Sequence, residues 1–137
     1  MHRSLLLLSA LALFAAVPHL AGAQPAKPAL YTAEQATAGA AVYSQSCAAC
    51  HGAQMEGVAA PALKGDVFGQ MATAQGLTAQ SLFDVVANTM PQSDPGSLKP
   101  EEYSAVTAYI LQQNGYPAGS TALANGAAGL KDAKVTP

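Results

Sequence analysis

Three stretches of the chain place apolar and small residues at intervals of three and four, the spacing that predicts an amphipathic helix. The first follows the segment Thr32-Ala33-Glu34-Gln35, which has the form of a capping box, and is predicted to end near Ser46. One stripe of this helix contains Ala36, Gly39, Ala40 and Tyr43. Because glycine weakens a helix by about 1 kcal/mol relative to alanine, Gly39 is either a tolerated weakness or a point of close helix–helix approach.

The other two helices have clear ends in the sequence. One is predicted to run from Thr78, as the N-cap residue, to Met90, where Pro91 terminates it. The other begins at Pro100, with two acidic residues near the positive end of the helix dipole, and ends at Gly115. Its buried stripe is predicted to consist of Tyr103, Val106, Thr107, Ile110 and Leu111.

The remaining segments are rich in glycine, alanine and proline. We predict an extended leader over 24–31, a turn-rich loop over 91–98, and a flexible tail over 120–137, outside a domain that spans 32–119. Residues 52–77 are predicted to form a long loop with at most a short helical turn around Val67–Ala72. Such a long loop is uncommon unless it wraps something. The predicted fold is all-α with a small core, which a large apolar prosthetic group would help to fill.

Residues 1–23 have the layout of a secretory signal peptide. His2 and Arg3 form a basic end, an apolar run extends from Leu5 to Val17, and Ala21-Gly22-Ala23 is a small-x-small cleavage pattern. The alternatives are a membrane anchor or an N-terminal core helix, but the run is shorter than the about 20 residues that a membrane span needs. We therefore predict export to the periplasm, cleavage after Ala23, and no membrane span in the mature chain.

Cleavage would leave five lysines, no arginine and eight acidic residues. This slightly acidic composition contains no basic patch that would bind nucleic acid or anionic lipid. Cleavage would also leave a single histidine, His51, and only two cysteines, Cys47 and Cys50. These three residues lie together in the motif CAACH.

Three kinds of chemistry could use this motif. A structural zinc site needs four protein ligands, and no acidic residue has a spacing that would complete one. A thiol–disulfide motif normally follows a strand in a βαβ pattern, whereas a predicted helix precedes Cys47. Covalent haem attachment explains every residue, because Cys47 and Cys50 are about one helical turn apart and His51 lies on a neighbouring face.

If His51 filled one axial position of a haem iron, the opposite position would hold methionine, lysine, water or nothing. Met55 is too close to His51 in sequence to reach the far face, and Met71 remains an option. Met90 is favoured because it follows a helix and is far enough along the chain, although it could also be a core residue that closes this helix. A methionine opposite histidine would raise the reduction potential and leave no open site for oxygen.

With the motif CAACHG following a helix that carries Gly39 and Tyr43, the chain resembles the class I monohaem cytochromes c over about residues 31–119. The segment APALKG (60–65) is similar to the proline-leucine segment of this family, and TMPQ (89–92) to its axial-methionine loop. The resemblance implies a cytochrome c fold of three to five helices around one haem c. The haem would be attached to Cys47 and Cys50, with His51 and Met90 as iron ligands.

The resemblance also implies that the carbonyl of Pro61 accepts a hydrogen bond from the His51 ring. The apolar walls of the haem pocket are expected to come from Leu63, Phe68, Leu82, Val86 and Ile110. Partners for the haem propionates are poorly specified, because the mature chain has neither arginine nor tryptophan. Gln92, Ser93 and backbone N–H groups are the candidates.

The implied function is that of an electron carrier, not an enzyme, which moves single electrons between a donor and an acceptor protein in the periplasm. The run from Tyr103 through AYILQQNGYPAG is similar to cytochromes that accompany bacterial quinoprotein dehydrogenases. A quinoprotein dehydrogenase and a terminal oxidase are therefore candidate partners. The alternatives are an open-site haem ligand binder or peroxidatic enzyme, a thiol oxidoreductase without haem, and a cytochrome subunit fixed to a dehydrogenase.

Overall fold

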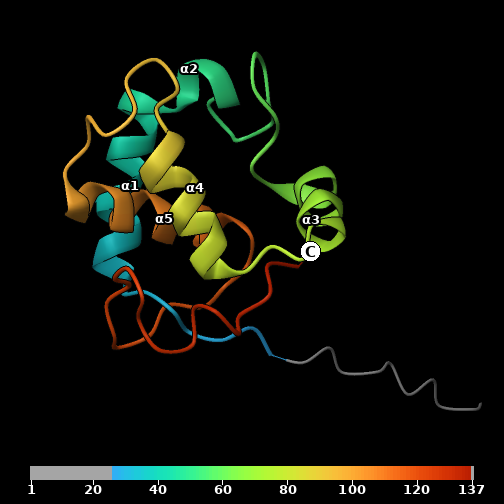
Figure 1. Ribbon diagram of the computed structural model, residues 1–137, viewed down its shortest axis with the longest axis vertical. Helices are drawn as coiled ribbons and strands as arrows, with labels where there is room; N and C mark the ends of the chain where they lie inside the picture. The colour runs from blue at the N-terminus through green and yellow to red at the C-terminus, as the bar shows by residue number, and fades with distance from the viewer. Residues whose placement is uncertain (1–25, 137) are drawn as a thin grey trace, which may run out of the picture.

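The computed structural model describes residues 26–136, and within this range the chain forms five helices and no strand. The helices are α1 (Ala33–Ser46), α2 (Ala48–His51), α3 (Gly65–Ala74), α4 (Ala79–Thr89) and α5 (Pro100–Gln113). Figure 1 shows α1, α4 and α5 grouped together, with α3 set apart on the other side of the molecule. The predicted all-α fold is confirmed. The predicted signal peptide (1–23) and the first two residues of the leader (24–31) lie outside the described residues.

Side-chain caps define the starts of α1 and α4, as the sequence predicts. Thr32 Oγ1 accepts a hydrogen bond from the Gln35 N–H at 3.3 Å, and the Gln35 side chain accepts one from the Thr32 N–H at 3.2 Å. Thr78 and Ser81 form the same reciprocal pair at the start of α4. The capping boxes satisfy N–H groups that have no partner within the helix.

Helix α3 corrects the prediction of a loop over 52–77 with at most a short turn around Val67–Ala72. It has ten residues and buries only Phe68, Gly69 and Ala72, while Val67 is 72% exposed. Two of these three buried residues are small, so the sequence pattern shows no strong apolar stripe. Packing of Phe68 against the core stabilises the helix more than its own propensity does.

The contact between α1 and α5 is the most extensive one between helices of the described chain. At the crossing, a Cβ atom added to Gly39 would lie 1.9 Å from the Ala105 carbonyl oxygen and 2.9 Å from the Tyr109 Cβ. One turn further along α1, the rings of Tyr43 and Tyr109 pack with their centroids 5.6 Å apart. Gly39 is therefore the point of close approach, not a tolerated weakness.

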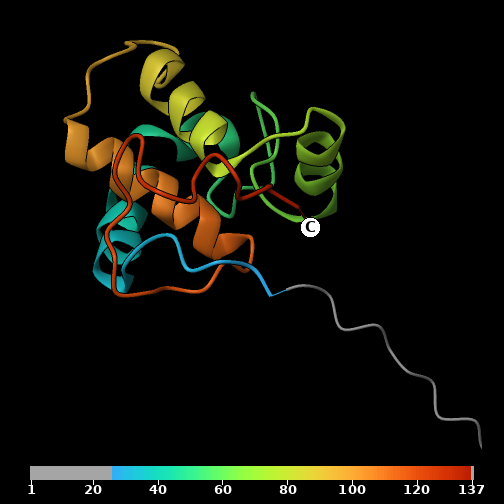
Figure 2. The same ribbon diagram turned by 60° about the horizontal axis from the view of Figure 1, so that its bottom comes forward.

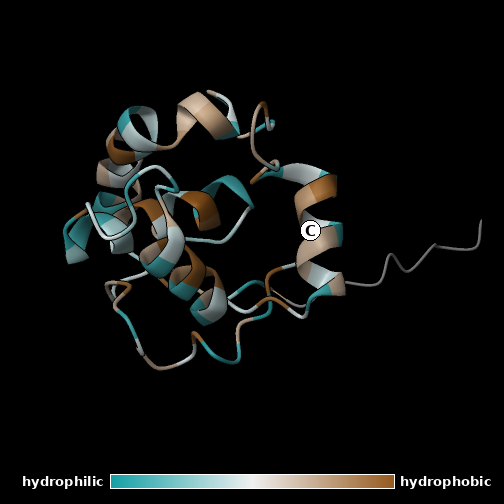
Figure 3. Cartoon of the chain, turned by 45° about the horizontal axis from the view of Figure 1, so that its top comes forward, coloured by the Kyte–Doolittle hydropathy of each residue, from teal (hydrophilic) through white to brown (hydrophobic). Residues whose placement is uncertain are grey.

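The helices that surround the core each combine hydrophobic and hydrophilic residues (Figure 3). The predicted stripe of α5 is confirmed, since all five of its residues are buried. In α1, Ala36, Gly39 and Tyr43 are buried and Ala40 is half-buried. The helices thus meet through faces that the sequence pattern predicts, with α3 as the exception.

The C-terminal segment 116–136 packs against the helices, which the prediction of a flexible tail over 120–137 did not anticipate. Its buried side chains include Leu123, Leu130 and Val135, each at most 2% exposed. Figures 1 and 2 show this segment alongside the N-terminal segment, and the Gly119 N–H donates to the Tyr31 carbonyl at 2.7 Å. The apolar residues of the tail follow no regular period, so the pattern gave no sign that they are buried.

The same segment caps α4. The Ala79 N–H donates to the Ala133 carbonyl at 2.8 Å, and the Gln80 N–H donates to the Leu130 carbonyl at 3.0 Å. These are among the first N–H groups of the helix, which have no partner within it. The C-terminal segment thus completes both the core and the start of α4, and the packed domain extends past residue 119.

Gly39→Ala should destabilise the protein by about 1–3 kcal/mol, although alanine is the better helix former. The added methyl group meets a backbone carbonyl, which no rotamer change can move. Urea unfolding would measure the effect. Ala38→Ser, on the exposed face of α1, is the control and should change stability by at most about 0.5 kcal/mol. A Gly39→Ala protein as stable as the parent would contradict the close contact.

Leu130→Ala should destabilise the protein by about 2–5 kcal/mol, because it leaves a cavity where the C-terminal segment enters the core. The neighbouring Lys131 is exposed, and Lys131→Ala should change stability by no more than about 0.5 kcal/mol. Urea unfolding of both variants provides the comparison. Equal, small effects at the two positions would show that this segment does not pack in solution.

Candidate functional site

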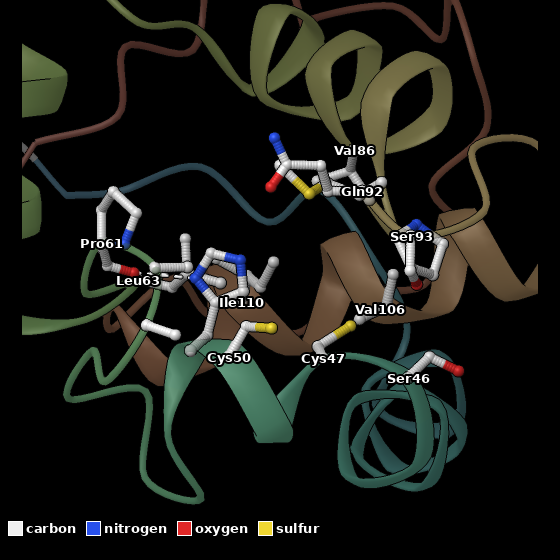
Figure 4. Close-up of a pocket in the computed structure, with 15 residues that line it drawn as sticks. Ser46, Cys47, Cys50, Pro61, Leu63, Val86, Gln92, Ser93, Val106 and Ile110 are labelled. Carbon is white, nitrogen blue, oxygen red and sulfur yellow. Dashed lines mark hydrogen bonds between the residues drawn. The ribbon is translucent and has the colours of Figure 1, made fainter.

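A cavity of about 580 Å³ lies between α2, the C-terminal end of α4, and α5 (Figure 4). Its volume is in the range of about 300–1,000 Å³ that is usual for small-molecule and cofactor sites. Six of the residues predicted to hold or contact a haem line it: Cys47, Cys50, His51, Pro61, Leu63 and Met90. Residues far apart in sequence are thus brought to one site.

The other predicted pocket residues divide into two groups. Val86 and Ile110 line the cavity, as do the candidate propionate partners Gln92 and Ser93, whereas Phe68 and Leu82 lie in the core away from it. The cavity is also lined by residues that the sequence analysis did not assign to it: Ser46, Ala59, Ala60, Pro91 and Val106. The sequence pattern could have assigned Val106 to the cavity, since this residue lies one turn from Ile110 on the same stripe of α5.

The two cysteines lie on one helical turn. Cys47 follows α1 and precedes α2, and its carbonyl accepts hydrogen bonds from the N–H groups of Cys50 and His51 at 3.1 and 3.0 Å. Both thiols are free, Cys47 half-buried and Cys50 exposed. Figure 4 shows their side chains on one side of the cavity, with Val86 and Gln92 on the opposite side. Two thiols therefore lie at the border of the same apolar cavity.

The His51 ring has one defined partner. Its Nδ1 lies 2.8 Å from the Pro61 carbonyl oxygen, and the side chain is buried. A carbonyl can only accept, so this hydrogen bond requires the proton on Nδ1. Nε2 then keeps a free lone pair, the form in which imidazole binds a metal. The structure places Pro61 where the resemblance implied.

Backbone hydrogen bonds hold the turn 58–60, which leads to Pro61 beside the His51 ring. The Cys50 carbonyl accepts from the N–H groups of residues 58–60 at 3.0–3.2 Å, which folds this turn against the CAACH motif. Further along, the Asn114 side chain donates to the Leu63 carbonyl at 2.8 Å. The cavity wall that contains Pro61 and Leu63 is thus fixed from both the motif and the end of α5.

The three methionines of the described chain lie in different surroundings. Met90 is the C-cap residue of α4 and lines the cavity. Met55 is buried in the core beside the motif, and Met71 is half-buried in α3; neither lines the cavity. Of the three, only Met90 therefore lies at the cavity that His51 also lines.

The cavity is weakly polar. Apart from the imidazole and the two thiols, its polar side chains are those of Ser46, Gln92 and Ser93, and no acidic or basic side chain of residues 26–136 lines it. Within the same range, no three His, Cys, Asp or Glu side chains are grouped so that they could hold a metal ion. The donors present are one imidazole, one thioether and two thiols around an apolar space, and this set fits a haem attached through two cysteines.

Tyr43 secures the end of the motif. Its hydroxyl donates to the Gly52 carbonyl at 2.6 Å, which ties α1 to the residue that follows His51. Burial of the ring, the largest cause, raises the pKa of Tyr43 to about 12 from its ordinary value of 10.0. The neutral, hydrogen-bonded phenol is therefore the form that the folded protein favours.

Residues 34–110, more than half of the chain, match the model of a protein family described as cytochrome c oxidase, cbb3-type, subunit III. The chain belongs to this family of c-type cytochrome domains. No curated protein matches it. The family and the helical architecture establish a class I c-type cytochrome with the all-α cytochrome c fold, a haem-binding protein of electron transfer. Such a domain implies covalently bound haem c. No helix in residues 26–136 is long and apolar enough to cross a membrane.

Tyr43→Phe should change the pH dependence of stability. The folded-state pKa of Tyr43 exceeds the unfolded value, so its contribution is complete below pH 10 and is lost as the pH rises toward about 12. The free energy of unfolding should therefore fall less steeply in Tyr43→Phe than in the parent across this window, by up to about 1.4 kcal/mol per pH unit. Urea unfolding between pH 9 and about pH 12 measures this slope.

The matched control is Tyr109→Phe, which alters the ring packed against Tyr43 but leaves the hydrogen bond from Tyr43 to Gly52. This control should keep the steep alkaline fall. Equal slopes in the parent and in Tyr43→Phe would contradict the assignment of a raised pKa to this residue.

Proposed function

We propose that this protein is an exported monohaem c-type cytochrome with histidine and methionine as axial ligands, and that it carries single electrons between redox proteins in the periplasm. The observation that supports this most is that one apolar cavity is lined by Cys47, Cys50, His51 and Met90. A carrier needs an anchored prosthetic group with both axial positions filled, and these four residues can supply that.

In this proposal, each residue of the site has a distinct role. Cys47 and Cys50 would hold the haem through thioether bonds, and His51, through Nε2, and Met90 would be the ligands of its iron. The bound haem supplies reversible one-electron chemistry at iron. The Pro61 carbonyl keeps the proton of His51 on Nδ1, which fixes the ring and increases its basicity as a ligand.

The surroundings favour a high reduction potential. A thioether is a soft and neutral donor that stabilises ferrous iron. Among residues 26–136, no carboxylate or ammonium group lines the cavity, and an apolar pocket disfavours the extra positive charge of ferric iron. Both effects act in the same direction, as expected for an acceptor of electrons from a dehydrogenase.

The rival functions are less well supported. A thiol oxidoreductase needs a cysteine with a lowered pKa, whereas burial, more than the nearby Cys50, raises the pKa of the Cys47 thiol. An open-site ligand binder or peroxidatic enzyme needs a free axial position, yet Met90 lines the same cavity as His51. The described part of the chain also contributes no acidic or lysine side chain to the lining, which leaves few groups for proton transfer.

The partners in this proposal are a donor such as a quinoprotein dehydrogenase and an acceptor such as a terminal oxidase. The family description, which names a cbb3-type oxidase, supports an oxidase as acceptor. Docking would use the surface near Cys50, where Val58 is 73% exposed and its N–H is bonded to the Cys50 carbonyl. With few charges, steering should be weak and the transfer rate insensitive to salt. A fixed subunit of a dehydrogenase is the alternative arrangement.

Mass analysis and redox-titrated absorption spectra of the exported protein would test the function. The parent should carry one covalent haem and show the red absorption band of methionine ligation when oxidised. Met90→Ala should lose this band and lower the midpoint potential by about 0.1 V or more, within the about 0.8 V range that haem axial ligands span. Met71→Ala is the control and should leave both unchanged.

A parent protein with no added porphyrin would refute the proposal entirely. Carbon monoxide binding to the reduced parent would instead favour the open-site ligand binder. Loss of the methionine band in Met71→Ala but not in Met90→Ala would show that Met71, not Met90, is the ligand. The proposed electron-transfer function would then still hold.

A further inference from the structure

The loop 90–98, which connects α4 to α5, has few hydrogen bonds that fix its shape. Residues 92–97 are all exposed. Its internal hydrogen bonds are two turn bonds, from the Asp94 N–H to the Pro91 carbonyl at 3.0 Å and from the Ser97 N–H to the Asp94 carbonyl at 3.3 Å. Met90 is the first residue of this loop, so the position of its side chain depends on what holds the loop in place.

One side chain of α5 bridges the two ends of the loop. The Tyr103 hydroxyl donates to the Met90 carbonyl at 3.1 Å and lies 3.4 Å from the Leu98 N–H, from which it accepts. The residue is 6% exposed. Among the described residues, no other hydrogen bond joins loop 90–98 to α5 or to the rest of the chain beyond the last turn of α4.

A phenol is suited to this bridge, because its one O–H can donate to a carbonyl while a lone pair accepts from an N–H. The ring itself packs in the core against other helices. Tyr103 therefore ties the backbone at Met90 to α5 through a hydrogen bond. Phenylalanine at this position would keep the ring and its packing but would lose the bridge.

We propose that Tyr103 is a positioning residue for the axial ligand: its hydroxyl fixes the Met90 backbone so that the thioether stays in the cavity. The proposal rests on the proposed role of Met90 as iron ligand. It predicts that loss of the hydroxyl alone makes the methionine easier to displace, with the fold and the haem attachment intact. Tyr103 is not among the residues that line the cavity, and its hydroxyl bonds to the backbone of the loop.

The test compares Tyr103→Phe with Tyr31→Phe in the holoprotein. Tyr31 is a second buried tyrosine whose hydroxyl donates to a backbone carbonyl, that of Tyr116, in the C-terminal segment and outside the cavity lining. Both changes remove one buried hydroxyl, so the urea midpoints should shift to a similar small extent. A purely structural role predicts no other difference between the two variants.

Added imidazole is the probe for methionine displacement, followed through loss of the red absorption band. Tyr103→Phe should bind imidazole at least about fivefold faster than the parent, the factor expected for loss of the hydrogen bond to the Met90 carbonyl alone. Tyr31→Phe should bind it at the parent rate. Amide exchange at Leu98 in the reduced protein should also be faster in Tyr103→Phe, and the midpoint potential should fall.

Equal imidazole binding rates in the parent, Tyr103→Phe and Tyr31→Phe would overturn the proposal, and so would equal increases in both variants. If Tyr103→Phe gives no folded protein, amide exchange of the parent is the test, and exchange at Leu98 as fast as at the exposed Gly96 would overturn the proposal. The Met90→Ala variant distinguishes failure of the proposed ligand, Met90, from failure of the proposed role of Tyr103. A spectrum of Met90→Ala identical to that of the parent refutes Met90 as ligand and this proposal with it, whereas a changed spectrum with equal imidazole rates refutes only the role of Tyr103.

Discussion

The close contact between α1 and α5 sets the geometry on which the site depends. Gly39 allows the α1 backbone to lie against the carbonyl of Ala105. Because Cys47 directly follows α1 and α5 carries Val106 and Ile110, this contact also fixes the distance between the cysteine side of the cavity and its apolar wall. A wider separation, required by any larger residue at Gly39, would move these two walls apart.

The two sides of the cavity are built in different ways. The side of the cavity that contains His51 is built from one short segment, Cys47 through Pro61. Hydrogen bonds to the carbonyls of Cys47 and Cys50 hold this segment. The side of the cavity that contains Met90 is assembled from distant parts of the chain: the Met90 N–H bonds to α4, and Tyr103 provides the hydrogen bonds that join loop 90–98 to α5. Closing longer loops carries a larger entropic penalty, so the methionine side should be the first to open.

This difference also explains what could be predicted from the sequence. The motif at 47–51, the capped starts of α1 and α4, and the stripe of α5 are local patterns, and each was predicted within about one residue. A helix end and Pro91 mark Met90 in the sequence, and it lines the cavity, while its role as an iron ligand stays a prediction. Helix α3 was missed because its buried face consists mostly of small residues, and the C-terminal segment because its buried leucines follow no period.

Distant contacts therefore hold α4 at both ends. At its start, the carbonyls of Leu130 and Ala133 accept from the first N–H groups of the helix, and the buried Gln80 side chain bonds to Asn125 and Gly126. At its end, Tyr103 bonds to the Met90 carbonyl. A helix of eleven residues has little stability of its own in water. The location of Met90 is consequently a property of the whole chain, including a C-terminal segment that contributes no residue to the lining of the cavity.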